Sequence, residues 1–272
     1  MLGSCATLVL GSLIIPSFFT SPTLIHLTFF CVLSWNNETL NIWSHLFGFI
    51  VFFGLFVYDM TVVFYKYKGT EYDAIIASFV LFCFMICMLL SSLYHTLNCR
   101  SEDSCRKWLS YDIFGISASF LAIFLSGIYY GFWCPEYLTH QLTCLLLFST
   151  VLCRLLGEEW EWARVTLFSV WAASGLLPTI HWTILHGGIG SGIVQIFLPR
   201  IFVMYGISGT AVIVYVWKVP ERYFPGRFDF VGASHQLWHV IIVAALVHWH
   251  QTGLEYARYR QAYGCNTSMI FP

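Results

Sequence analysis

Five polar or ionisable residues lie at the ends of apolar segments that are long enough to cross a bilayer. Ser91, His95 and Asp112 fall in one short stretch, and His235 and His239 follow much later in the chain. Such groups are costly and rare at membrane depth, so each is a candidate for a functional site. Three histidines are also a sufficient ligand set for an open zinc site.

The spacing of these residues suggests how they would work together. Ser91 and His95 are four residues apart, as are His235 and His239, so each pair shares one face of a helix. We expect the three histidines to bind Zn²⁺ and to leave a fourth position for water, whose pKa zinc lowers to about 7. Asp112 would hold that water or accept its proton, and Ser91 would add a hydrogen bond. An amide or ester entering from the bilayer could then be hydrolysed.

The alternative is that each histidine is a hydrogen-bonded residue of the helix bundle. We favour this simpler role for the lone histidines His45, His140 and His181, and we expect His248 and His250 to lie at the membrane interface. For His95 and its partners we favour metal, because burying several such groups at one depth without compensation is expensive.

The composition indicates an integral membrane protein. Of the 272 residues, 58% are hydrophobic and only 10% are charged, and the mean hydropathy is +0.72. A soluble domain carries about 25% charged residues. The net charge of −1 provides no basic field for nucleic acid. The ten cysteines lie mostly in apolar runs and do not suggest a disulfide scaffold; Cys99 and Cys105 could be alternative ligands, but reduced structural thiols are favoured.

Apolar stretches of the right length predict an all-α, seven-helix integral membrane bundle. The predicted spans are 42–64, 74–97, 112–132, 138–156, 164–184, 199–217 and 234–256. They form one membrane domain over residues 34–261, followed by a lumenal tail at 262–272. Residues 1–33 are an atypical apolar segment: an extra span, a re-entrant piece or, as we favour, a gene-model artefact.

Positive charge favours the cytoplasmic side of a membrane. With the end before the first span in the cytoplasm, the inner loops hold eight Lys and Arg residues and the outer side holds five. This predicts an N-in, C-out topology, which puts the ends carrying His95, Asp112 and His235 on one cytoplasmic side. Of the two glycosylation sequons, at Asn37 and Asn266, only Asn266 should then be modified.

Several multi-residue motifs occur in a recognisable order. They are Asn37-Glu38-Thr39 with Asn41-Ile42-Trp43-Ser44-His45, Ser91-Ser92-Leu93-Tyr94-His95, Asp112-Ile113-Phe114-Gly115-Ile116, Lys218-Val219-Pro220-Glu221-Arg222-Tyr223-Phe224-Pro225-Gly226 and Ser234-His235-Gln236-Leu237-Trp238-His239. They resemble the NET-x-NIWSH, S-x-x-x-H, D-x-x-GI, K-x-PER-[FY]-FPG and SHQ-x-x-H motifs of the progestin and adipoQ receptor (PAQR) family. The match runs from Cys31 to Gln261.

This resemblance implies a zinc ion inside the membrane, bound by His95, His235 and His239 with Asp112 and Ser91 beside it. Stretches such as Leu185–Gly190 and Tyr256–Gln261 look most like a Golgi member that holds Raf kinase and damps Ras–Raf–MEK–ERK signalling. Other members are associated with ceramidase-type hydrolysis or with steroid binding. Where the family has a polar cytoplasmic segment, residues 1–30 are almost uncharged, which argues against kinase docking there.

Three functions follow as expectations. The first is a Golgi anchor for Raf kinase, which needs no catalysis. The second is a zinc-dependent amide hydrolase acting on a ceramide-like lipid. The third is a lipid, steroid or adiponectin-type receptor in which zinc is structural.

Overall fold

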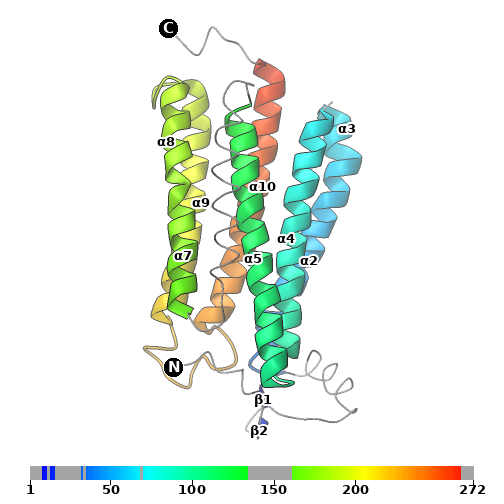
Figure 1. The fold of residues 1–272 in the computed structure, drawn as a ribbon, viewed down its shortest axis with the longest axis vertical. Helices are drawn as coiled ribbons and strands as arrows, with labels where there is room; N and C mark the ends of the chain where they lie inside the picture. Colours follow the sequence, from blue (N-terminus) through cyan, green and yellow to red (C-terminus); the bar gives the residue numbers. More distant parts are fainter. Residues whose placement is uncertain are drawn as a thin grey trace. The chain divides into compact units, whose positions relative to one another are not determined.

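The computed structural model describes residues 8–10, 13–15, 32, 35–67, 70–133 and 161–264. Its elements are β1 (Leu8–Leu10), β2 (Leu13–Ile15), α2 (Thr39–Tyr58), the π-helical turn η1 (Asp59–Val63), α3 (Phe64–Tyr67), α4 (Glu71–Leu97), α5 (Glu102–Gly131), α7 (Glu161–Ser174), α8 (Leu176–Leu185), α9 (Gly192–Trp217) and α10 (Ser234–Tyr263) (Figure 1). The antiparallel pair β1–β2 lies in the atypical segment 1–33, with Leu8 opposite Ile15. Residues 35–67, 70–133 and 161–264 contain helices and no strand, so the predicted all-α class of the membrane domain is confirmed.

Five helical segments among the described residues are long and apolar enough to cross a membrane. They are Thr39–Lys66, Glu71–Leu97, Glu102–Gly131, Trp162–Leu185 and Gly192–Trp217. Each contains most or all of a predicted span, and the span predicted at 138–156 lies outside the described residues. The chain is therefore a multi-pass membrane protein.

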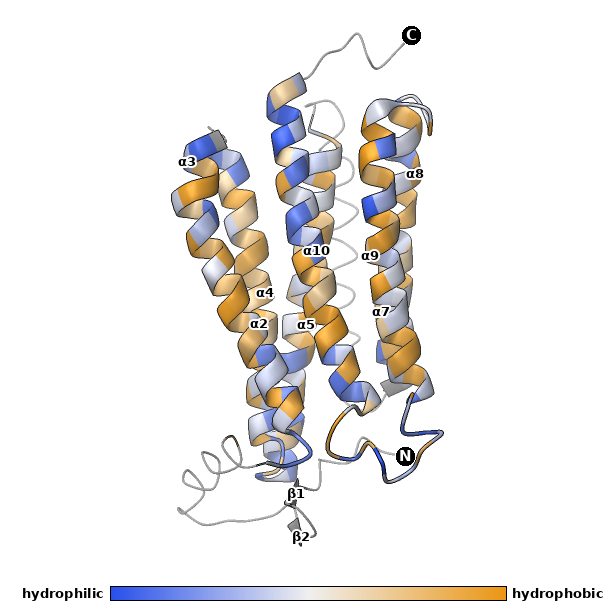
Figure 2. Ribbon diagram, turned by 180° about the vertical axis from the view of Figure 1, so that it is seen from behind, coloured by the Kyte–Doolittle hydropathy of each residue, from blue (hydrophilic) through white to orange (hydrophobic). Residues whose placement is uncertain are grey.

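The helix α10 covers the predicted span 234–256 but is not one of these five segments. Figure 2 shows the reason: hydrophilic residues recur along α10, whereas α4 is mostly apolar. Four histidines lie on α10, among them His239 and His250, which are buried. A helix whose polar groups face protein rather than lipid can be less apolar than a lone span.

Two segments predicted as loops are partly helical. Between the predicted spans 74–97 and 112–132, α5 already begins at Glu102, and between the predicted spans 164–184 and 199–217, α9 already begins at Gly192. Ser101 accepts a hydrogen bond from the backbone N–H of Ser104 at 3.0 Å, and Glu102 and Asp103 occupy the first turn of α5. A cap and early acidic residues stabilise a helix start that hydropathy alone does not reveal.

The chain divides into two compact units, which we describe separately. Unit 1 comprises Met1–Phe53, Phe84–Ile116 and Ile207–Ala245, and unit 2 comprises Gly54–Cys83, Ser117–Gly206 and Leu246–Pro272.

In unit 1 the helices α2, α4 and α5 approach one another closely. A Cβ atom added at Gly115 of α5 would lie 2.9 Å from the Cα atom of Cys87 on α4. The ring of Phe52 on α2 packs edge-on against Phe84 on α4, with centroids 5.4 Å apart. Because Gly115 follows Asp112 by one helical turn and Cys87 precedes Ser91 by one turn, the close approach draws those two polar residues together.

In unit 2 a buried aromatic cluster holds α5, α8, α9 and α10. The indole N–H of Trp182 donates to the Tyr256 hydroxyl at 2.6 Å, and the Phe197 and Tyr256 ring centroids are 4.2 Å apart. The indole N–H of Trp249 on α10 donates to the Ser126 hydroxyl at 2.9 Å. Both indole donors therefore have partners, as buried tryptophans require.

Candidate metal centre

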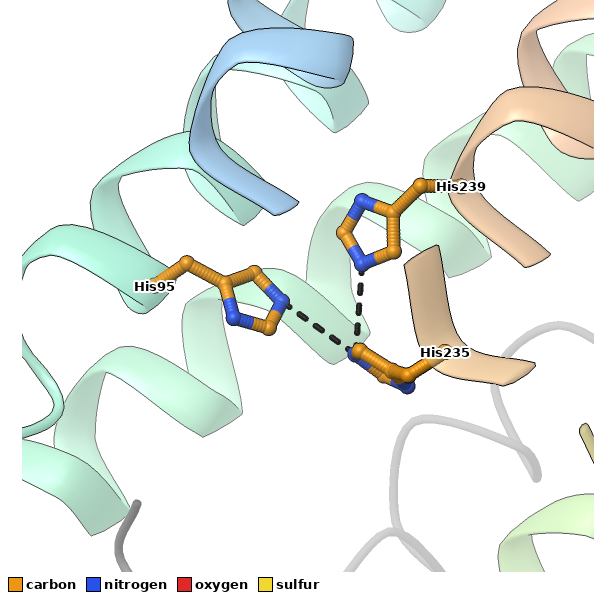
Figure 3. Close-up of side chains that lie close together, drawn as sticks. All are labelled: His95, His235 and His239. Atoms are coloured by element: carbon orange, nitrogen blue, oxygen red, sulfur yellow. Dashed lines mark hydrogen bonds between the residues drawn. The ribbon is translucent and has the colours of Figure 1, made fainter. Parts of the chain in front are cut away.

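Three histidines from two helices of unit 1 converge through their Nε2 atoms (Figure 3). The Nε2 of His235 lies 3.3 Å from that of His95 and 3.2 Å from that of His239. One ligand atom from each lies within 4.8 Å of the others, close enough to hold a metal ion. His95 and His239 are buried and His235 is half-buried.

Capping at the start of α10 holds two of these histidines. Glu221 accepts hydrogen bonds from the backbone N–H of Ser234, at 2.8 Å, and from its hydroxyl. The Gln236 side-chain oxygen accepts from the backbone N–H groups of Gly232 and Ala233 at 2.7 and 3.2 Å. These bonds satisfy donors at the helix start, as an N-terminal cap does. His235 in the first turn is therefore aimed by a defined helix end.

Glu38 orients the third histidine, and sequence reasoning missed this role. Its Oε2 accepts from His95 Nδ1 at 2.8 Å and from Asn41 Nδ2 at 2.7 Å. Burial raises the pKa of Glu38, but the attraction of His95 and its hydrogen bond outweigh burial and hold the pKa of the carboxyl below its usual value. An ionised carboxylate only accepts, so the proton of His95 sits on Nδ1 and its Nε2 presents a lone pair.

Asp112 and Ser91 lie beside this cluster. The Asp112 carboxylate hydrogen-bonds to the Ser91 side chain and interacts electrostatically with His95. Its Oδ1 is buried and lacks a hydrogen-bond partner among the described residues. The tertiary structure thus gathers all five residues selected from the sequence.

His45 also belongs to this region, in contrast to the simple bundle role expected for it. Its ring centroid is 3.8 Å from that of His239, and both of its ring nitrogens are buried without a hydrogen-bond partner among the described residues. Glu38 lies in the turn immediately before α2, and His45 follows it by seven residues inside that helix, a spacing of about two helical turns. That spacing is the signal that could have linked His45 and Glu38 to the site.

A polar pocket of about 280 Å³ opens beside the cluster. We call it the vestibule. It is lined by Asn37, Glu38, Asn41, Tyr94, His95, Asn98, Asp229, Ala233, His235 and Gln236. Water or a polar group in the vestibule could reach His95 and His235.

Other candidate histidines lie elsewhere. His250 is buried within the protein, and its Nε2 pairs with Asp59 Oδ2 at 2.6 Å in unit 2. His248 Nε2 lies 2.9 Å from the backbone oxygen of Arg200, and the His181 ring packs against Phe132.

The remaining predictions concern other residue types. Cys99 is half-buried and Cys105 is buried, and neither is part of the metal-ligand group found among the described residues. His140, the glycosylation candidate Asn266 and most of the lumenal tail lie outside the described residues.

Comparison with known proteins agrees with the motifs. The sequence profile of haemolysin-III-related proteins matches residues 33–249. The chain is 43% identical over 238 residues to progestin and adipoQ receptor family member 3 of Homo sapiens, covering 85% of this chain and 76% of that protein. It is 31% identical over 245 residues to the adiponectin receptor protein of Drosophila melanogaster, covering 87% of this chain and 54% of that protein.

A plant relative extends the match. The chain is 29% identical over 254 residues to heptahelical transmembrane protein 1 of Arabidopsis thaliana, covering 87% of this chain and 74% of that protein. The predicted family resemblance is confirmed by the profile match and by the animal relatives. The chain belongs to the haemolysin-III-related family of progestin and adipoQ receptor proteins.

Proposed function

We propose that this chain is a zinc-binding membrane protein of the PAQR family that acts in signalling at the Golgi. The observation that carries the zinc assignment is the convergence of three buried or half-buried histidine nitrogens. Three neutral imidazoles with Nε2 atoms 3.2 and 3.3 Å apart cannot all satisfy one another with the protons available. A shared cation removes this conflict.

The donor set fits Zn²⁺. Zinc bonds histidine nitrogen at ~2.0–2.1 Å in tetrahedral geometry, which separates neighbouring ligand nitrogens by about 3.3 Å. The separations involving His235 are 3.3 and 3.2 Å. The ligands would be His95, His235 and His239, with Glu38 fixing the tautomer of His95 as carboxylates do for zinc-bound histidines.

The same site supports hydrolysis of an amide lipid. Bound zinc would supply a hydroxide-generating Lewis acid near neutral pH. Asp112 would hold a water molecule and take its proton on Oδ1, and the hydrogen bond to Ser91 would hold the carboxylate in place. The vestibule would admit that water beside His95 and His235. Asp112 is therefore the proposed general base.

Metal analysis tests the zinc assignment. Purified wild-type protein should contain about one zinc ion per chain, and His239→Ala should lose it. The exposed His181 provides a matched control, since His181→Ala should keep the metal. A well-folded wild-type protein without zinc would sink the assignment.

Turnover separates the hydrolase from a receptor. Ceramide-like amide hydrolysis should be abolished in Asp112→Ala while zinc stays bound. Saturable lipid or steroid binding without turnover would instead favour the receptor with structural zinc. Turnover that persists without the histidines would contradict the hydrolase.

A second role, tethering of Raf kinase at the Golgi, is supported by two observations. They are the 43% identity to family member 3 and the resemblance of Leu185–Gly190 to a Golgi member that holds Raf. Tagged Raf should move to Golgi membranes when this chain is expressed and ERK phosphorylation should fall. Raf that stays cytosolic while the chain sits in the Golgi would refute the tether, whether or not zinc binds.

A further inference from the structure

The loop between the last two described helices carries three exposed basic side chains. We call residues 218–233, which join α9 to α10 in unit 1, the α9–α10 loop. Lys218, Arg222 and Arg227 are exposed on it, and none of their side chains has a partner among the described residues. The backbone N–H of Arg222 donates to the Lys218 carbonyl at 2.9 Å, so these two cations lie one turn apart. All three are available to an anion from outside the chain.

The acidic side chains of the loop do not pair with these cations. Glu221 is held at the start of α10, where it accepts from the backbone N–H of Ser234 at 2.8 Å and from its hydroxyl. Asp229 is exposed and lines the vestibule. A zinc ion on the histidines would offset the carboxylates of Glu38 and Asp112 beside it. The loop therefore keeps an excess of positive charge.

The other described charges at this end of unit 1 have the same balance. The contact of His95 with His235 puts the turn between α4 and α5 at the end that carries the loop. That turn contains one ion pair and three further exposed charges, two positive and one negative. They are Glu102 with Arg106, and Arg100, Lys107 and Asp103. A surface of this sign attracts anions.

Exposed aromatic side chains accompany the cations. Tyr223 is 67% exposed and Phe224 is 49% exposed, and both follow α9, whose last residue, Trp217, is 57% exposed. The backbone N–H groups of Tyr223 and Phe224 donate to the Pro220 carbonyl at 3.0 and 3.3 Å, which holds the two rings in one turn. Figure 2 shows both hydrophilic and hydrophobic residues along this loop. Aromatic rings with polar neighbours are stabilised at the level of the lipid head groups.

The loop lies at a membrane surface, because of the helix that precedes it. The segment Gly192–Trp217 is long and apolar enough to cross a bilayer, and the loop begins at the next residue. The predicted topology puts the loop on the cytoplasmic side, where the leaflet carries anionic lipids that attract clustered Lys and Arg. Rings and cations on one short loop match the two parts of such a lipid, its glycerol level and its charged head group.

We propose that the α9–α10 loop is a docking surface for anionic phospholipids of the membrane that the chain spans. Lys218, Arg222 and Arg227 bind the negatively charged head groups. Tyr223 and Phe224 enter the leaflet at the level of the glycerol backbone. The inference goes beyond the proposed function, since it requires neither zinc nor hydrolysis.

Lipid ranking on detergent-solubilised wild-type protein tests this inference. Native mass spectrometry measures the lipid bound as phosphatidylglycerol or phosphatidylcholine of equal chain length is added. Phosphatidylglycerol should bind at least about fivefold more tightly. Equal affinity for the two lipids would overturn the inference and leave a protein partner for the loop. Glycerol phosphate, which has the charge but no acyl chains, should not displace the lipid, and equal competition by it would overturn the assignment to a lipid.

Variants then assign the preference to the loop. Arg222→Gln combined with Arg227→Gln should weaken phosphatidylglycerol binding by about 25-fold, about fivefold for each charge removed, and leave phosphatidylcholine binding unchanged. The matched control, Arg100→Gln combined with Lys107→Gln, removes two exposed cations from the turn between α4 and α5 and should lose less than about fivefold. Equal losses in the two double variants, or no loss in the first, would contradict the loop as the binding surface.

These four side chains are exposed, so both double variants should keep the unfolding temperature of the wild-type protein. If one of them did not fold, the lipid ranking on wild-type protein would still decide.

The aromatic residues are tested separately. Tyr223→Ser combined with Phe224→Ser should weaken both lipids by a similar factor, about tenfold, because the rings contact the part that the two lipids share. Tyr65→Ser combined with Tyr263→Ser, at two exposed rings outside the loop, is the control and should bind both lipids as wild type does. Unchanged lipid binding in the loop variant would refute the insertion of its rings.

Discussion

Units 1 and 2 both bury ionisable side chains, but they compensate them in opposite ways. In unit 1 His95 Nδ1 pairs with Glu38, but the Nε2 atoms of His95, His235 and His239 face one another. In unit 2 unlike groups pair: Asp59 with His250 at 2.6 Å, and Asp73 with Arg260 at 2.7 Å. A carboxylate and a basic side chain satisfy each other, whereas clustered imidazole nitrogens need a further group, such as a metal ion, to satisfy them. Burial of polar residues alone therefore does not indicate a ligand site.

The buried carboxylate of Asp73 is fully hydrogen-bonded by other side chains of the protein. Asp73 is fully buried, and its carboxylate accepts from Arg260, from the Tyr129 hydroxyl at 3.0 Å and from the Thr70 hydroxyl at 2.6 Å. The Arg260 guanidinium also lies 5.0 Å from the centroid of the Tyr129 ring. Every strong acceptor position on Asp73 is filled from within the chain, so we assign this network to stability.

Removing one member of that network should have the largest effect. Asp73→Ala leaves the Arg260 charge buried without its carboxylate, which costs about 3–5 kcal/mol. Thermal unfolding in detergent should show the loss, while the folded fraction should keep its zinc. Glu71→Ala, at an exposed acid two residues earlier, should change little. If the unfolding temperature of Asp73→Ala were no lower than that of Glu71→Ala, the hydrogen-bond network around Asp73 would not stabilise the protein.

Removal of zinc with a chelator tests the histidine cluster of unit 1. With free zinc about a hundredfold above its Kd, bound metal stabilises the folded state by about 2.7 kcal/mol, and a chelator should remove that stability. The shift in unfolding temperature should vanish in His95→Ala and persist in His250→Gln. An equal chelator shift in His95→Ala would place the metal elsewhere.

Glu38→Gln should weaken the metal centre without abolishing it. The amide cannot hold the His95 tautomer as a carboxylate does, so zinc affinity should fall about 10- to 100-fold. Competition with a fluorescent zinc chelator measures this change. Glu102→Gln, at an exposed acid in the first turn of α5, is the control. Unaltered zinc affinity in Glu38→Gln would show that Glu38 does not orient His95 for metal binding.

The smallest effect is expected at a surface ion pair on α10. Arg258 and Glu255 are 2.7 Å apart, with side chains 37% and 42% exposed. Solvent screens such a pair, so Glu255→Ala should cost about 0–1 kcal/mol in unfolding. Measured beside Asp73→Ala, it compares an exposed and a buried ion pair that both involve α10. If Glu255→Ala lost as much unfolding free energy as Asp73→Ala, burial would not explain why the Asp73 pair stabilises the protein.

Much of the fold was predictable because membrane crossing imposes a local rule. A span must be long, apolar and helical, so hydropathy located Glu71–Leu97 and Gly192–Trp217 closely enough to identify them. Helix starts were less predictable. The capping hydrogen bond of Ser101 starts α5 within a polar stretch, where an apolar window gives no signal.

The candidate site was predictable in part for a similar reason. Helical spacing alone puts His235 and His239 on one face, and matched depth suggested that His95 would join them. The same reasoning did not reveal that His250 is buried against Asp59. A histidine paired with a carboxylate and one facing other histidines look alike in sequence, because the partner comes from a distant helix.

The sequence by itself determined the class of protein, the spans and the local spacing of the polar residues, since these depend on helix geometry and on the solvent a helix must enter. Only the tertiary structure decided which polar groups meet. The close approach of Gly115 to Cys87 brings α5 against α4, and the turn before α2 carries Glu38 to His95. Distances between helices arise from packing of residues remote in sequence, so no local pattern records them.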